Sequence, residues 1–184
     1  MLILKCDRGK NQTYPGNNFG YHLIPFKAAI AAGARQIMPY YSRPIGTQYP
    51  EVAFAFNKPI ITGLLREELG FQGIVVSDWY LITDHVLSGE ALPARAWGVE
   101  YLSELERTQG VLDAGCDQFG GEVRPELLVQ LVNEGKISEK SESSRGVVPR
   151  LRDEINPQRQ MLTRRRARLL RTQASEREVS PRTL

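Results

Sequence analysis

A short apolar run near the middle of the chain limits most strongly what the chain can fold into. Residues 74–76 read Ile-Val-Val, with Gly73 before them and Ser77, Asp78 and Trp79 after them. β-Branched residues without polar interruption are typical of strands buried on both faces, and such strands belong to parallel sheets. Parallel strands need long crossover connections, usually helices, so the sequence predicts alternating strands and helices.

Apolar spacing on both sides of this run predicts that alternation. Apolar residues at intervals of three and four predict helices at about 23–32, 61–69, within 92–113 and at 124–135. Shorter apolar stretches predict strands within 34–41 and at about 114–119, whereas 1–20 has the composition of a loop. This order of elements indicates an α/β fold with right-handed parallel crossovers.

Charge is distributed unevenly along the 184 residues, which include 24 lysines and arginines and 21 acidic residues. Residues 140–184 hold 12 of the basic residues and 5 of the acidic ones, with many serines and little apolar periodicity. Such a composition buries too little apolar surface to fold. We therefore expect one folded domain in 1–139 and a disordered basic tail in 140–184.

Composition also excludes several classes of protein. No stretch approaches the roughly 18 apolar residues of a membrane-spanning helix, so no membrane partner is expected. The 2 cysteines and 2 histidines are too few for a disulfide framework or a histidine-rich metal centre, so neither a metal nor a cofactor is expected. The N-terminus lacks the apolar core of an export signal, which predicts a cytoplasmic location by default.

The residues at the end of the central apolar run are the best candidates for chemistry. Ligands of parallel α/β folds bind at the carboxyl ends of the strands, which is where Asp78 falls. The indole of Trp79 beside it offers a flat apolar face for a sugar ring. Spacing alone leaves an alternative open, in which Asp78 caps a following helix and Trp79 packs in the core.

Four segments resemble a known family. GIVVSDW, with ITGLLREELGFQG before it, closely resembles the nucleophile region of glycoside hydrolase family 3, and YPGNNFGYHLIPFKAAIAAGARQIMPYYS resembles the preceding segment. AGCDQFGGE and PELLVQLVNEGKIS resemble the family segments after the nucleophile strand, so the resemblance covers roughly 12–139. It implies part of a (β/α)8 TIM barrel, about three βα units, where a whole barrel takes about 250 residues.

The resemblance also implies a reaction and three site residues. Asp78 is expected to be the nucleophile of a retaining glycosidase, attacking the anomeric carbon of a terminal β-linked sugar. Trp79 is expected to line the subsite beside the scissile bond, and Tyr41 to hydrogen-bond the carboxylate or the sugar. The implied substrates are β-glucosides, β-xylosides or oligosaccharides.

The reaction needs a second carboxyl group as acid and base, and no residue here matches the family's. The other acidic residues considered for that role are Asp84, Glu100, Asp117 and Glu122. Asp117 is the best of these, because it lies near another predicted strand end. Each is more typical of a helix cap or a solvated charge.

The chain also departs from the family pattern, and the departures suggest other functions. It has no Lys-His pair for sugar hydroxyls, Tyr80 stands where a small residue is expected, and the sequence after Glu139 resembles the product of a reading-frame change. The chain alone is therefore expected to be inactive unless a complementing chain supplies the missing barrel half. One alternative is a non-catalytic remnant that binds sugar. Another is a protein that binds nucleic acid or other anions through the arginines of Arg164–Arg168. Against this second alternative, 140–184 contains no aromatic residue on which a base could stack.

Overall fold

The computed structural model describes residues 9–137. The predicted tail at 140–184 and Cys6 lie outside these residues. Within them, no helix combines the length and the apolar character needed to cross a membrane.

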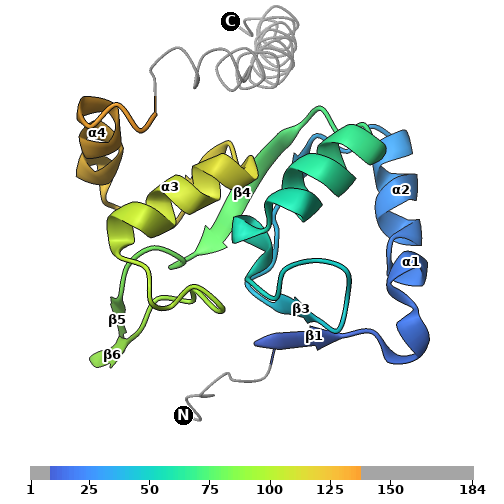
Figure 1. Ribbon diagram of the computed structural model, residues 1–184, viewed down its shortest axis with the longest axis horizontal. Coiled ribbons are helices and arrows are strands. Elements are labelled where there is room, and N and C mark those ends of the chain that lie inside the picture. The colour runs from blue at the N-terminus through green and yellow to red at the C-terminus, as the bar shows by residue number, and fades with distance from the viewer. Residues whose placement is uncertain (1–8, 138–184) are drawn as a thin grey trace, which may run out of the picture.

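A parallel sheet of three strands forms the centre of the fold, in the order β2-β4-β7 (Figure 1). The strands are β2 (Gln36–Ile37), β4 (Ile74–Trp79) and β7 (Gln118–Gly120). Both neighbours pair with β4 in parallel, so all three carboxyl ends lie at one edge of the sheet. The predicted α/β fold is confirmed, and within residues 9–137 the sheet is open and does not close into a barrel.

Helices connect these strands, mostly where the apolar spacing predicts them. They are α1 (Phe19–His22), α2 (Ile24–Ala31), the π-helix η3 (Pro59–Glu68), α3 (Glu104–Ala114) and α4 (Pro125–Asn133), with 3-10 turns η1 (Pro15–Asn17) and η2 (Phe54–Phe56). Helices η3 and α3 contact each other and lie side by side over the same face of strand β4 (Figure 1).

One predicted helix is much shorter than its apolar spacing suggests. Within 92–113 the helix begins only at Glu104, because Ser103 and Glu106 form a capping box. The Ser103 hydroxyl accepts from the Glu106 amide, and the Glu106 carboxylate accepts from the Ser103 amide at 2.8 Å. Residues 93–103 form a loop instead, and Tyr101 is 82% exposed.

Two small sheets were not predicted from the sequence. Strand β1 (Asn11–Thr13) lies in the predicted N-terminal loop and pairs in parallel with β3 (Arg43–Ile45). Strands β5 (His85–Leu87) and β6 (Glu90–Leu92) form an antiparallel hairpin directly after the central strand. Three-residue strands carry too short a pattern to be recognised by alternation.

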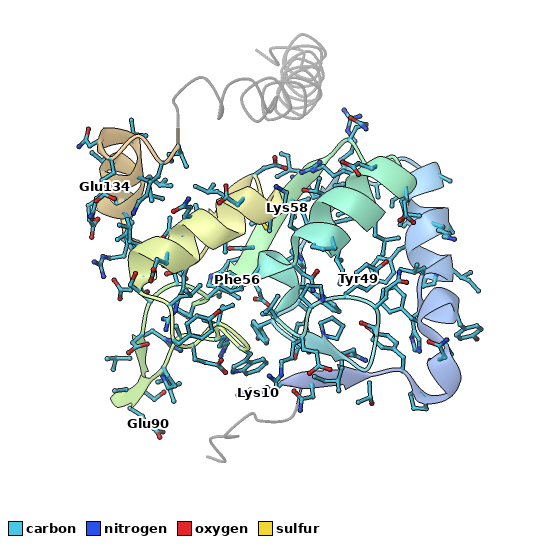
Figure 2. All side chains as sticks on the ribbon, viewed as in Figure 1. Lys10, Tyr49, Phe56, Lys58, Glu90 and Glu134 are labelled. Carbon is cyan, nitrogen blue, oxygen red and sulfur yellow. The ribbon has the colours of Figure 1, made fainter. Side chains whose placement is uncertain are left out.

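The core lies between the central sheet and helices η3 and α3. Val75 of β4 and Val111 of α3 are fully buried, and Ile61 of η3 is 2% exposed. Burying such side chains stabilises a fold by about 1.5–3 kcal/mol each. Phe56 joins this core to a smaller cluster around Ala96, and its place in the middle of the molecule is visible in Figure 2.

Two edges of the central sheet carry no further strand in the described residues, because β2 and β7 each pair on one side only. Beside β2, the apolar side chains of Ile24 and Phe26 on α2 are 57% and 51% exposed. A helix normally buries such a face against a sheet. The described residues are thus one part of a larger α/β layer.

Candidate active site at the end of strand β4

Asp78 lies at the carboxyl end of β4 and is 6% exposed. The strand continues through Trp79, and the next helix begins 26 residues later, at Glu104. Asp78 therefore does not cap a following helix, as one interpretation of the sequence allowed. Its Oδ1 instead accepts the Trp79 amide at 2.7 Å, which fixes the orientation of the carboxyl group on a stiff strand.

Three influences set the pKa of Asp78. Burial raises it, whereas the hydrogen bond from the Trp79 amide and the positive charge of Arg95 lower it. Burial is the largest, so the pKa of Asp78 lies above the ordinary range for aspartate. The positive charge of Arg95 thus offsets part of the cost of burying the ionised form of this carboxyl group.

The indole of Trp79 is 46% exposed, so it does not pack in the core. Gly120 and Gly121, at the end of β7, lie against it. A Cβ added at Gly121 would overlap Trp79 Cδ1, and one at Gly120 would lie 3.0 Å from Cε3. The backbone of two glycines thus supports the indole, while part of its surface remains open to a ligand.

Tyr41 follows strand β2, which is parallel to β4, so it comes to the same edge of the sheet as Asp78. Its hydroxyl accepts a hydrogen bond from Arg95 Nη1 at 3.2 Å. The Arg95 guanidinium also lies 4.7 Å from the centre of the Tyr41 ring, and Trp97 contacts that ring edge-on at 5.5 Å. The direction of the strands thus places Tyr41, Asp78 and Trp79 at one edge of the sheet.

Sequence reasoning missed Arg95 and Trp97. Both lie in the loop between β6 and α3, where a helix was predicted. The only signal in the sequence is an arginine and a tryptophan two positions apart before Gly98, and by itself this pattern indicates no role.

Three acidic residues considered for the second carboxyl group have structural partners. Glu122 accepts the Ile82 amide at 2.8 Å and the Thr83 hydroxyl at 2.9 Å. Asp84 accepts the Ala94 amide at 2.8 Å. Glu100 accepts the Gly98 amide and forms an ion pair with Lys10 at 3.0 Å. These carboxylates organise loops.

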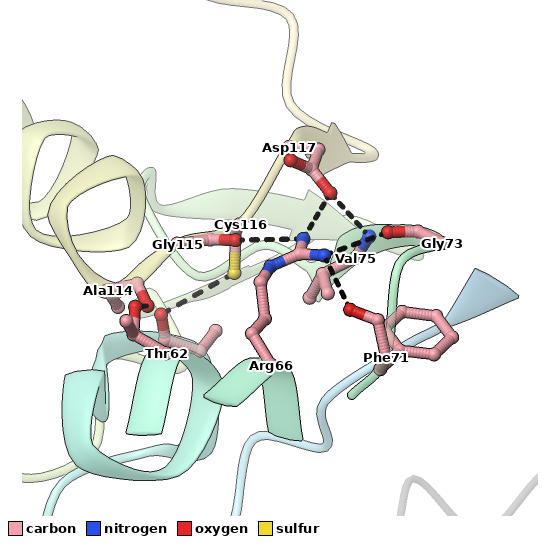
Figure 3. A network of polar contacts seen from close by, with 10 residues as sticks. Thr62, Arg66, Phe71, Gly73, Val75, Ala114, Gly115, Cys116 and Asp117 are labelled. Carbon is pink, nitrogen blue, oxygen red and sulfur yellow. Dashed lines mark hydrogen bonds and ion pairs between the residues drawn. The ribbon is translucent and has the colours of Figure 1, made fainter. Parts of the chain in front are cut away.

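Asp117 lies beside Val75, near the start of β4, in the polar network drawn in Figure 3. It precedes β7, so it belongs to the amino end of the strands, and the preference for it as second carboxyl group was wrong. It forms a buried ion pair with Arg66 at 2.5 Å and accepts the Val75 amide at 2.8 Å. Arg66 also donates to the carbonyls of Gly73 and Gly115, so this network joins η3, β4 and the start of β7.

Tyr80 has a φ of +59°, in the left-handed region that favours glycine. A glycine at this position would avoid the steric cost that a Cβ pays in this conformation. The Tyr80 ring stacks on His85 at 3.9 Å, and burial lowers the pKa of His85.

Among residues 9–137, no cluster of three or more histidines, cysteines and carboxylates could hold a metal ion.

Residues 11–147 match the model described as Glycosyl hydrolase family 3 N terminal domain. The chain belongs to glycosyl hydrolase family 3. Among family 3 relatives, Beta-glucosidase C of Emericella nidulans is 72% identical over 131 residues, which cover 71% of this chain and 21% of that protein. The periplasmic beta-glucosidase/beta-xylosidase of Dickeya chrysanthemi is 39% identical over 145 residues, with 71% of this chain and 22% of that protein covered. The chain thus spans about a fifth of the length of the curated relatives it matches.

Solved structures agree on the fold. The beta-glucosidase from Listeria innocua matches with a TM-score of 0.57 at 22% identity, covering 79% of this chain and 18% of that one. CbsA from Thermotoga neapolitana also gives 0.57, at 21% identity, covering 77% and 32%. The parallel sheet is therefore part of the TIM-barrel-like domain of family 3, as the sequence predicted.

Proposed function

We propose that this chain carries the nucleophile segment of a retaining β-glycosidase that removes terminal β-linked sugars. The observation that carries the proposal is the carboxylate of Asp78, fixed at the carboxyl end of a buried strand beside a half-exposed indole. In barrel folds of this kind, residues at that end of a strand are typically catalytic.

The chemistry assigned to Asp78 proceeds in two displacements. Its carboxylate attacks the anomeric carbon, the bond from that carbon to the leaving oxygen breaks, and the oxygen takes a proton from a second carboxyl group. Water then attacks the glycosyl ester and gives a proton back to that second group, which releases Asp78 and retains the anomeric configuration. Two groups in these roles lie about 5–5.5 Å apart.

Trp79 and Tyr41 are assigned to the sugar. The exposed part of the Trp79 indole supplies a flat apolar surface, and sugar rings present such a surface through their C–H groups. The Tyr41 hydroxyl, already bound by Arg95, can accept or donate at the same edge. Relatives named beta-glucosidase and beta-glucosidase/beta-xylosidase support a β-glucoside or β-xyloside as the substrate.

The second carboxyl group and the remaining strands are assigned to polypeptide other than residues 9–137. Two features support a position for this polypeptide beside the sheet. Strands β2 and β7 each pair on one side only in the described residues, and the apolar side chains of Ile24 and Phe26 on α2 are exposed. The structural partners of the chain's own candidate carboxylates support the same assignment.

A mechanism-based inhibitor tests the proposal. We would incubate the chain with an activated 2-deoxy-2-fluoro-β-glucoside, alone and with the preceding barrel segment of Beta-glucosidase C added as a separate chain. Mass spectrometry should find a glycosyl adduct on the peptide with Asp78, stronger in the mixture. Asp78→Asn should abolish it, whereas Asp113→Asn, at an exposed carboxylate, should not. An adduct elsewhere, or none even in the mixture, would contradict the proposal.

A further inference from the structure

The loop that carries Arg95 is fixed firmly to the end of the central strand. Ala94 and Ala96 on either side of it are 6% and 0% exposed. The Arg95 amide donates to the Tyr80 carbonyl at 2.7 Å, and the Ala94 amide donates to Asp84 at 2.8 Å. The main chain at Arg95 therefore has a defined position relative to the residues just after Asp78 in sequence.

The Arg95 side chain is fixed at its other end by Tyr41. One guanidinium nitrogen donates to the Tyr41 hydroxyl at 3.2 Å, and the group lies 4.7 Å from the ring centre. A cation within about 6 Å of an aromatic ring centre is attracted to it. Trp97 contacts the Tyr41 ring edge-on at 5.5 Å, so two side chains of the same loop contact the tyrosine.

We propose that Arg95 is a positioning residue of this site, whose guanidinium, clamped by Tyr41, supplies the positive charge that acts on the Asp78 carboxylate. This inference rests on the proposed function, because it gives Asp78 its role, but its central measurement needs no turnover. Arg95 comes from a loop, 17 residues after Asp78 along the chain, so the fold and not the local sequence brings the two together.

The charge balance around Asp78 is consistent with this role. Burial disfavours the carboxylate, and the amide of Trp79 and the guanidinium of Arg95 favour it. Arg95 also faces His85, which feels the nearby carboxylates of Asp84 and Glu122 as well, and burial and Arg95 lower the pKa of that imidazole. Because its pKa is lowered, His85 is neutral at neutral pH. The positive charge near Asp78 is then that of Arg95.

A titration of the Asp78 carboxyl carbon tests the proposal in the full chain. Asp78→Asn identifies its ¹³C signal, and the pKa is then measured in the wild type, Arg95→Gln and Arg95→Lys. We expect Arg95→Gln to raise the pKa of Asp78 and Arg95→Lys, which keeps the charge, to bring it back towards the wild-type value. Arg43→Gln is the control, because Arg43 binds Asn11 at 2.7 Å on another sheet, and it should leave the pKa unchanged.

Labelling by the fluoroglycoside gives a second readout. In Arg95→Gln the pH profile of labelling should move to higher pH, and labelling below the pKa should slow about tenfold for each unit by which the pKa rises. If Arg95→Gln does not fold, Tyr41→Phe, which removes the hydroxyl that holds the guanidinium, replaces it.

An Asp78 pKa that is the same in the wild type and in whichever of these two variants folds would overturn the role of Arg95. Absence of labelling in the wild type, even in the mixture with the preceding barrel segment, would instead count against the proposed function, and the titration would still decide on Arg95.

Discussion

Replacement of Arg66 by methionine tests the reasoning about what holds the sheet together. Arg66 is 16% exposed and Asp117 is 3% exposed, so their ion pair is shielded from water. The guanidinium also donates to the carbonyls of Phe71, Gly73 and Gly115, at 3.4, 3.0 and 3.3 Å (Figure 3). One side chain of η3 thus satisfies acceptors from two other segments of the chain, the one before β4 and the one before β7.

Arg66→Met keeps the length of the side chain and removes every donor. Removing one partner of a buried ion pair costs about 3–5 kcal/mol, because the other charge remains buried without compensation. Asp117 still accepts the Val75 amide at 2.8 Å, which places the expected loss near the lower end of that range. We therefore expect the free energy of unfolding to fall by about 3 kcal/mol.

Urea unfolding followed by tryptophan fluorescence measures this loss. Arg124→Met is the matched control, since Arg124 forms ion pairs with Glu104 and Glu126 at a largely exposed position, and it should shift the midpoint little. The double variant Arg66→Met/Asp117→Asn should recover part of the loss, because no buried charge is left unpaired. A loss below about 1 kcal/mol for Arg66→Met would refute the structural role of the pair.

Three further predictions concern the site and its surroundings. Gly121→Ala should displace the neighbouring indole, weaken fluoroglycoside labelling and cost about 1–3 kcal/mol of stability from overpacking, whereas Gly135→Ala, at a similar φ of +67° in open space, should leave labelling intact. Because the pKa of Asp78 is raised in the folded state, its contribution to the free energy of unfolding is lost as pH rises above the ordinary aspartate range. Asp78→Asn should therefore be more stable than the wild type in urea at pH 7 and equally stable in acid. Burial raises the pKa of the Cys116 thiol to about 12, so in a Cys6→Ser background iodoacetamide at pH 8 should react in urea and not in buffer; equal rates would contradict this burial.

The elements with a strong local pattern could be predicted from sequence. Ile74 and Val75 are 2% and 0% exposed, as expected for a strand covered on both faces. Helix α4 (Pro125–Asn133) lies within its predicted range of 124–135. Burial on one or both faces leaves a period in the sequence, so these features are readable without coordinates.

The boundaries and pairings that depend on distant residues could not be predicted. Trp97 and Tyr101 have helical spacing, but the cap at Ser103 starts the helix after them. Asp117 follows a helix and precedes a strand, a position that sequence reasoning took for the functional edge. The direction of the strand places it at the amino end instead, against Arg66.

The sequence by itself determined the α/β alternation, the buried central strand and the aspartate at its end, because each depends on residues a few positions apart. Only the tertiary structure decided that Arg95 meets Tyr41 across 54 positions and that Gly121 supports an indole 42 positions before it. Such contacts depend on how strands align in space. They leave no period in the chain, since the partners share a place in the fold and no interval in the sequence.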